Sequence, residues 1–290
     1  MSDSQLLRGT ALRRRSFDRF ISVLCLVAGV IALLPLAAVI AFLLIEGLKA
    51  WSPAFLVERP GSVVGPGGGA VHAIIGTFLM TGLALVIATP AALAVAVYVV
   101  EYRESRLAVV VRSAVDLLAG VPSIVVGIIV YALVVLTMKH FSGFAGSLAL
   151  AIIMLPIIAR TSEEMLKIVP RRLREGTMAL GMARWRALGF VFIPTVASGI
   201  LTGILLAVSR AIGETAPLLF TSLGSNFVQT DFSQPMSALP VYIFQNAINI
   251  GFPAAKERAW AGALTLVTIV LVLNLLGRWL ASRAAVRGAN

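Results

Sequence analysis

Long uncharged stretches alternate with short charged ones along the whole chain. Each uncharged stretch is close to the roughly 20 residues that a helix needs to cross the hydrocarbon core of a bilayer. Backbone N–H and C=O groups in lipid require partners within the same segment, so these stretches predict helices. We expect an all-α integral membrane protein with six spans. They cover Phe20–Ile45, Ile74–Val100, Leu117–Met138, Phe141–Ile158, Ala187–Phe220 with an interruption, and Ala259–Leu276.

Composition supports a lipid environment. Of the 290 residues, 59% are hydrophobic and 13% are charged, which is more apolar surface than one soluble core of this length can bury. The net charge of +11 is gathered in short clusters between the apolar stretches. A nucleic-acid-binding protein would need a continuous basic face on a soluble fold, so the charge indicates membrane topology and not nucleic acid.

The distribution of lysine and arginine predicts the orientation, because cytoplasmic loops are enriched in both. One side carries the N-terminal arginines, the clusters at 103–112, 160–186 and 278–287, and most of the 24 basic residues. Only Lys49, Arg59, Lys139, Lys256 and Arg258 fall on the other side. Both termini are therefore expected in the cytoplasm.

These boundaries predict an order of segments. Residues 1–19 form a basic cytoplasmic N-terminus and residues 20–48 the first membrane helix, which is too long for the apolar part of a signal peptide. Residues 72–283 form a five-helix transmembrane domain that contains a cytoplasmic coupling loop at 161–190, and residues 284–290 form a cytoplasmic tail. The outer loops, 49–71 and 222–258, are too short for an independent solute-binding domain, which needs roughly 100 residues. A receptor would be a separate protein.

The longest cytoplasmic segment carries a spaced motif. By itself it could be only a solvated connector of one or two amphipathic helices, divided at a proline. The motif favours a docking role, because its spacing matches the Glu-Ala-Ala, Gly, Ile-x-Leu-Pro pattern of ABC importer permeases. A short helix would fit a groove on an ATPase, followed by a glycine turn. The residues are Glu175, Gly176, Thr177, Gly181 and Pro194.

The chain contains no Gly-x-x-x-x-Gly-Lys-Ser/Thr phosphate loop. We therefore expect ATP and magnesium to be used by a partner ATPase, with no cofactor bound by this chain. One cysteine and two separated histidines offer neither a metal site nor a catalytic nucleophile of the usual kinds. The chain is expected to be a non-catalytic membrane subunit.

Two charged residues lie within an apolar segment, where each charge costs several kcal/mol unless it is paired or hydrated. Arg210 and Glu214 are four residues apart, which would place them on one helix face. Gly213 and Pro217 weaken the helix nearby, and irregular backbone at membrane depth is expected where it lines a cavity. The alternatives are an ion pair that only fixes packing, or a cationic position on the path of an anion.

Two further features are candidates beside this pair. Gly120 and Pro122 interrupt the third span near its start, which is often a simple kink. Arg160 closes the fourth span, where arginine usually anchors a helix end. The pairing of two helix breaks suggests a translocation path.

Taken together, these motifs resemble the phosphate-specific ABC permease subunits PstA and PstC. The similarity is carried by Leu118–Val125, Arg160–Leu166 and Arg210–Phe220, and the segment from Gln234 to Gly262 is more similar to PstA. It extends from about Ile74 to Leu276.

The resemblance implies a type I ABC importer permease fold with a cytoplasmic coupling helix, and import of inorganic phosphate by alternating access. It also implies that Arg210 and Arg160 take part in transport, with Glu214 as the acidic companion. The implied partners are a PstC-like permease, two copies of a PstB-like ATPase and a PstS-like phosphate receptor.

Other classes of transporter remain as alternatives. A permease for another oxyanion, such as sulfate or molybdate, would keep the docking loop and differ in the residues along the path. A secondary transporter would need no docking loop and would show paired repeats or a coupling-ion site. Neither feature is evident in the sequence.

Overall fold

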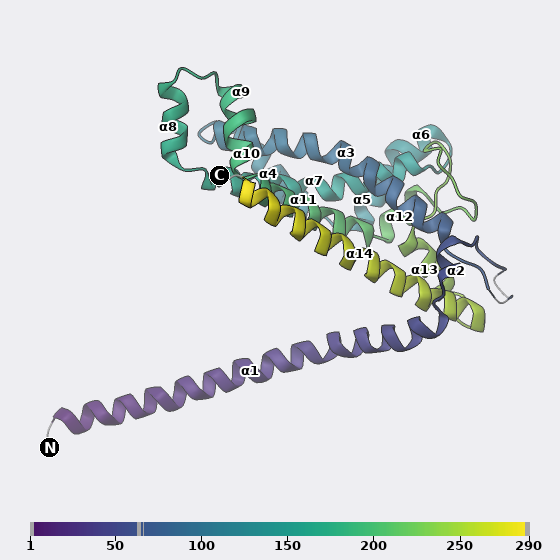
Figure 1. The fold of residues 1–290 in the computed structure, drawn as a ribbon, viewed down its shortest axis with the longest axis horizontal. Coiled ribbons are helices and arrows are strands. Elements are labelled where there is room, and N and C mark those ends of the chain that lie inside the picture. Colours follow the sequence, from purple (N-terminus) through teal and green to yellow (C-terminus); the bar gives the residue numbers. More distant parts are fainter. Residues whose placement is uncertain (1–2, 63–64, 66, 288–290) are drawn as a thin grey trace.

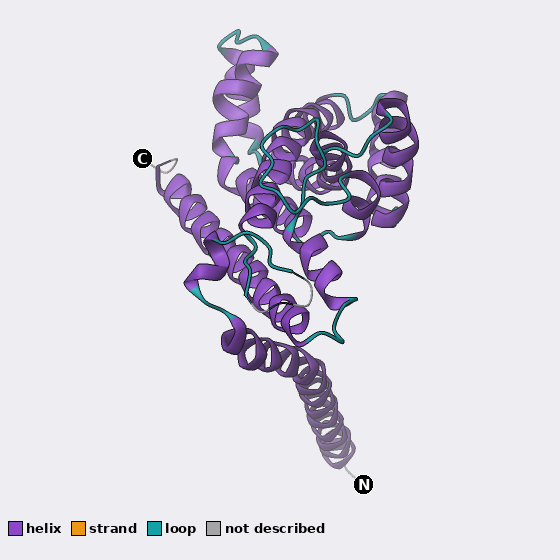
Figure 2. Ribbon diagram, turned by 90° about the vertical axis from the view of Figure 1, so that its right-hand side faces the viewer, coloured by secondary structure: helices purple, strands orange, loops and turns teal. Residues whose placement is uncertain are grey.

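The computed structural model describes residues 3–62, 65 and 67–287, and the side chains from Phe17 onward up to Trp279. Residues 1–2 and 288–290, at the two expected cytoplasmic ends, lie outside the described residues. The described chain consists of helices and loops, with one isolated bridge between Leu223 and Met236 as its β feature (Figure 2). The predicted all-α fold is confirmed.

Four helices are long and apolar enough to span a membrane, and two bent pairs raise the number to as many as six. The four are α1 (Asp3–Ala50), α3 (Val71–Glu101), α7 (Gly143–Ile168) and α14 (Pro253–Arg287). The first bent pair joins α4 (Arg106–Gly120) to the run α5 (Ser123–Val130), η1 (Tyr131–Val135) and α6 (Leu136–Met138) at 104°. The second joins the run α9 (Arg184–Ala187), η2 (Leu188–Phe192) and α10 (Ile193–Thr195) to α11 (Ala197–Ile212) at 74°.

The remaining helices are short and lie at opposite ends of the molecule (Figure 1). At one end α8 (Arg171–Ala179) stands beside α9, within the segment predicted to be cytoplasmic. At the other end lie α2 (Pro53–Val57) and α13 (Leu239–Ala247), which belong to the two predicted outer loops. The helix α12 (Ala216–Thr221) follows the break after α11.

Several predicted boundaries differ from the structure, and two of the differences, in α7 and α4, lie near the predicted path. The sequence predicts that the fourth span ends at Ile158, but α7 continues to Ile168, so residues 161–168 are not part of the coupling loop. The helix continues because this part still packs against α11: Gly203 faces Thr161, and Gly199 faces Met165. The third span is predicted to begin at Leu117, but residues 117–120 complete α4, before the chain turns.

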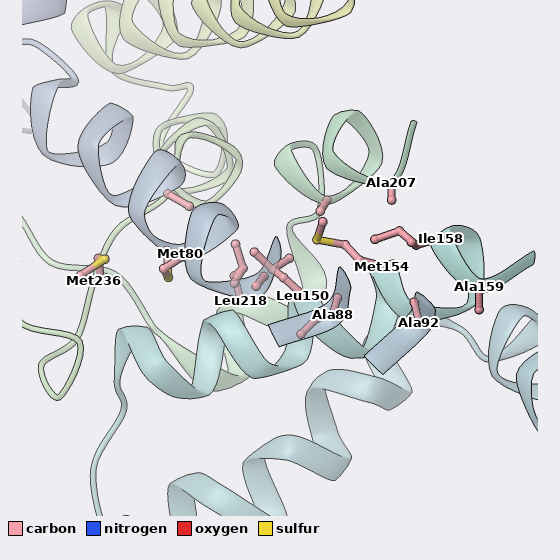
Figure 3. Packing of buried hydrophobic residues seen from close by; sticks show 14 of the residues in the cluster. Met80, Ala88, Ala92, Leu150, Met154, Ile158, Ala159, Ala207, Leu218 and Met236 are labelled. Carbon is pink, nitrogen blue, oxygen red and sulfur yellow. The ribbon is translucent and has the colours of Figure 1, made fainter. Parts of the chain in front are cut away.

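The core is built on the pairing of α3 with α7 (Figure 3). On α3, Ala84, Ala88 and Ala92 recur every fourth residue and are buried, which gives one face of small side chains. Larger buried side chains of α7, among them Leu150 and Met154, fill the space against them. Small residues allow two helices to approach closely, which is a common basis of packing inside membranes.

Helix α1 extends away from the other helices over most of its length (Figure 1). It meets α14 near its C-terminal end, where a Cβ added at Gly47 would fall 2.9 Å from the Leu264 Cβ. The rings of Phe42 and Trp260 lie 5.8 Å apart at the same contact. The apolar side chains described on α1 before this contact are exposed in the isolated chain.

Candidate translocation path and docking helix

The predicted docking motif forms a helix and a tight turn. Pro170 precedes the first residue of α8, as expected for a residue that divides two helices. Gly181 follows the helix with a φ of 67°, a left-handed conformation that favours glycine. The amide of Met182 donates to the carbonyl of Thr177 at 3.0 Å and closes the turn. The glycine six residues after Glu175 is therefore needed for the shape of the loop.

The residues of the motif differ in exposure. Glu175 and Gly176 are exposed on α8, whereas Thr177 is buried and donates its hydroxyl to the Arg174 carbonyl at 2.8 Å. Pro194 is exposed on α10, where the chain starts the bend into α11. The motif thus has an outward side that a partner could contact and a buried side that carries Thr177.

The predicted pair of Arg210 and Glu214 is present, although not on one helix. The Arg210 Nε lies 3.5 Å from the Glu214 Oε1, but α11 ends at Ile212 and Glu214 lies in the following turn. The side chain of Arg210 is 58% exposed and that of Glu214 is 14% exposed. The pair joins the last turn of α11 to the break that the sequence predicted around Gly213.

Arg210 and the first helix break line the same cavity. This cavity has a volume of about 70 Å³ and lies between Arg210, the turn that links α4 to α5, and α7. Ala119 and Val121 of the turn and Pro156 of α7 contribute to its wall. The structure therefore brings the Gly120–Pro122 break next to the charged residue of α11, although the two are far apart in the sequence.

The helices that follow the two breaks also meet. Pro217, in the first turn of α12, packs against Gly127 of α5. A Cβ added at position 127 would fall 2.6 Å from the Pro217 Cα. Gly127 was not identified from the sequence. The sequence offers little sign of its role, because a lone glycine in an apolar stretch does not indicate that another helix packs against it.

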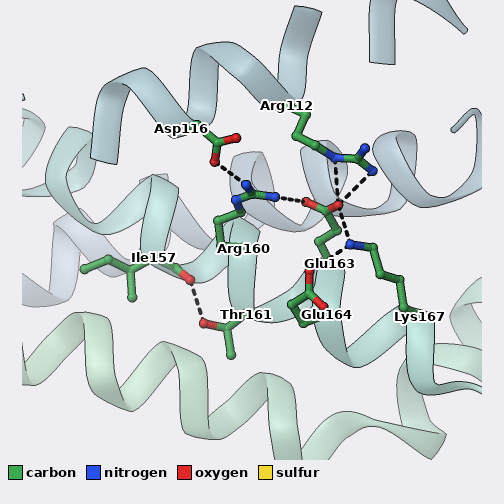
Figure 4. Close-up of polar contacts among 8 residues, drawn as sticks. All are labelled: Arg112, Asp116, Ile157, Arg160, Thr161, Glu163, Glu164 and Lys167. Carbon is green, nitrogen blue, oxygen red and sulfur yellow. Dashed lines mark hydrogen bonds and ion pairs between the residues drawn. The ribbon is translucent and has the colours of Figure 1, made fainter. Parts of the chain in front are cut away.

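Arg160 belongs to a different group of charges, on the side of α7 that faces α4 (Figure 4). Its guanidinium forms an ion pair with Asp116 of α4 and donates to the Glu163 Oε2 at 3.1 Å. Arg112 approaches the other oxygen of Glu163 at 2.8 Å, and Lys167 lies 2.9 Å from it. Arg160 does not line the cavity at Arg210.

Glu163 is the centre of this group, and the sequence did not single it out. Its side chain is 4% exposed and is paired with three cations. A buried carboxylate is tolerated only when it is paired and hydrogen-bonded, as Glu163 is. The spacing to Arg160 and Lys167, three residues before and four after, was a usable signal, because such positions share a helix face.

Comparisons with known proteins agree with the fold. A family model described as the binding-protein-dependent transport system inner membrane component matches residues 88–286. The phosphate transport system permease protein PstA of Yersinia pestis is 44% identical over 266 residues, which are 91% of this chain and 90% of that protein. PstA 1 of Mycobacterium tuberculosis (strain CDC 1551 / Oshkosh) is 38% identical over 281 residues, 93% of this chain and 90% of that protein.

Solved structures show the same fold at lower identity. A chain of the MetNI methionine ABC transporter, in an inward-facing conformation, superposes with a TM-score of 0.58 at 17% identity. The match covers 75% of this chain and 95% of that one. The expected type I ABC importer permease fold is confirmed. The chain therefore belongs to the family of binding-protein-dependent transport system inner membrane components, and within it to the phosphate transport system permease proteins PstA.

Proposed function

We propose that this chain is a membrane subunit of an ATP-driven importer that moves inorganic phosphate into the cytoplasm. The observation that carries the proposal is the 44% identity to a phosphate permease across nine tenths of both chains. Phosphate is preferred over sulfate or molybdate for the same reason. The docking motif on α8 favours this class over a secondary transporter, which has no use for an ATPase-binding helix.

Arg210 is the residue that we assign to the anion path. A guanidinium has five N–H donors, and the pair with Glu214 engages only Nε. Arg210 lines a cavity beside the turn between α4 and α5, where a phosphate oxygen could accept from the remaining donors. Glu214 holds the arginine in place and lowers the net charge, so that an anion can leave again.

We assign Arg160 to the same path with a different task. Its two terminal nitrogens are engaged by Asp116 and Glu163, so its charge is already balanced. It lies one helical turn beyond Pro156, which lines the Arg210 cavity. In this role Arg160 keeps α4 against α7 on the cytoplasmic side, and its separation from Asp116 would accompany opening of the path. The helix breaks at Gly120, Pro122, Gly213 and Pro217 would allow the segments on either side to move.

The docking helix connects this path to ATP hydrolysis. We infer that the exposed side of α8, with Glu175 and Gly176, binds the ATPase, while Gly181 and Pro194 shape the chain on its return to the membrane. ATP and magnesium would be bound by that partner and not by this chain. The assembly would contain a PstC-like permease, two PstB-like ATPases and a PstS-like receptor in the plasma (cell inner) membrane, with both termini of this chain in the cytoplasm.

The proposal is tested by anion uptake into proteoliposomes that contain the complete complex and its receptor. Wild-type complex is expected to accumulate radiolabelled phosphate in an ATP-dependent manner, and not sulfate or molybdate. Arg210→Gln is expected to lower phosphate uptake at least about tenfold, since a lost charge-assisted contact is worth roughly 1.5–3 kcal/mol. Arg106→Gln, which changes an exposed cytoplasmic arginine of α4, is the matched control.

Two results would contradict parts of the proposal. Uptake of sulfate or molybdate in preference to phosphate would assign the complex to another oxyanion. Normal phosphate uptake by Arg210→Gln, with the complex intact, would reduce Arg210 and Glu214 to a packing pair.

A further inference from the structure

Arg174 of α8 makes three contacts with three different elements. Its Nη1 donates to the Glu101 Oε1, at the end of α3, at 2.8 Å. Its Nη2 donates to the carbonyl of Leu166 on α7 at 3.0 Å. Its guanidinium carbon lies 5.0 Å from the centre of the Phe192 ring on η2, over the face of the ring. One side chain thereby touches three segments of the membrane domain.

The chemistry of these contacts requires arginine. The carbonyl of Leu166 lies in the last turn of α7, where carbonyl groups have no partner within the helix. The planar guanidinium donates from its edge to this carbonyl and to Glu101, and presents its face to Phe192 at the same time. The ammonium group of lysine is a single point charge and cannot satisfy all three.

Helix α8 has few other connections to the membrane helices. It stands apart from them at the end of the molecule (Figure 1). Among the described residues, Arg174 makes every hydrogen bond and ion pair that joins α8 to α3 or α7. Arg171 and Arg172, on the same helix, make no ion pair with any described residue.

Arg174 lies directly before the exposed residues of the docking helix α8. The next two residues, Glu175 and Gly176, are exposed, and successive residues of an α-helix point about 100° apart. A partner that contacts the outward side of α8 therefore moves a rigid helix whose inward side is fixed through Arg174. Through the contacts of Arg174, a displacement of α8 would act on α3, on α7 and on the segment that bends into α11.

We propose that Arg174 is the positioning residue that transmits movement of the bound ATPase from α8 to the membrane helices. This inference rests on the proposed function, because it requires an ATPase on α8. Loss of the side chain would leave docking and ATP hydrolysis largely intact and would uncouple them from transport.

The test measures anion uptake and ATP hydrolysis together, in proteoliposomes with the complete complex. For Arg174→Ala, phosphate transported per ATP hydrolysed is expected to fall at least about fivefold, the lower end of typical coupling between two sites. Arg174→Lys is expected to recover part of the ratio through its charge. Arg106→Ala, which changes an exposed arginine of α4 outside the docking helix, is expected to match wild type.

A merely structural role would lower uptake and hydrolysis together and leave their ratio unchanged, so an unchanged ratio in Arg174→Ala overturns the inference. Dissociation of the ATPase from Arg174→Ala, measured by co-purification, also overturns it, because the residue would then serve docking. If the wild-type complex takes up a different anion, the proposed substrate is wrong, and the same ratio measured with that anion decides the role of Arg174.

Discussion

Gly127 of α5 lies against Pro217 of α12, at a distance that excludes any side chain: an added Cβ would be 2.6 Å from the Pro217 Cα. Each residue belongs to a helix that starts just after a break in the chain. Their contact joins the two helices, so the Gly120–Pro122 break and the Gly213–Pro217 break are linked in the structure. Arg210 lines a cavity beside this unit.

Gly127→Leu is therefore expected to destabilise the protein. Overpacking of a close contact typically costs about 1–3 kcal/mol, so we expect a lower midpoint of thermal unfolding in detergent or nanodiscs. Gly82→Ala on α3 is the control, because a Cβ added there would have nothing within 4 Å and alanine is the better helix former. Equal stability of Gly127→Leu and wild type would show that α5 and α12 separate readily.

Glu163 is predicted to stabilise the junction of α4 and α7. Glu163→Gln removes the negative charge that pairs with Arg112, Arg160 and Lys167. The three cations would then repel one another with less negative charge between them. Breaking a buried ion pair costs about 3–5 kcal/mol, but the three cations are partly solvated, so we expect roughly 1–3 kcal/mol. Thermal unfolding of the purified complex measures the loss.

Glu164→Gln is the matched control for that change. Its side chain is 58% exposed and, among the described residues, forms an ion pair only with Lys167, so we expect a change within about 0.5 kcal/mol. The prediction is wrong if the two variants have the same stability.

The phenol of Tyr242 is predicted to lose its proton at a higher pH than an exposed tyrosine. Burial raises the pKa of its phenol from 10.0 to about 12, although the nearby Arg258 acts in the opposite direction. Burial favours the protonated phenol in the folded protein, so the contribution of protonated Tyr242 to the free energy of unfolding is complete below about pH 10. It is lost as the pH rises through about 12. The ultraviolet difference titration of wild type against Tyr242→Phe isolates this group. A difference signal complete by pH 10 would contradict its burial.

The sequence was sufficient for features that depend on local chemistry. Uncharged length indicated the helices, of which four are continuous candidate spans and two are bent pairs. The positive φ of Gly181 and the position of Pro170 before α8 agree with the turn and the division that the motif predicts. The Gly120–Pro122 and Gly213 breaks occur where glycine and proline predicted them. The pairing of Arg210 with Glu214 followed from their spacing, even though the helix ends between them.

Only the tertiary structure decided which of these features come together. The extension of α7 to Ile168 depends on Gly199 and Gly203 of α11, and the charge of Arg160 is balanced by Asp116 on another helix. Gly127 and Arg174 acquire their roles from partners that are 90 and 73 residues away. A single sequence records helix-forming tendency, apolar length and small-residue repeats such as Ala84, Ala88 and Ala92, but it does not show which helix faces meet one another. The physical reason is that lipid and protein interiors are equally apolar, so hydropathy cannot tell a face that meets another helix from one that meets the bilayer.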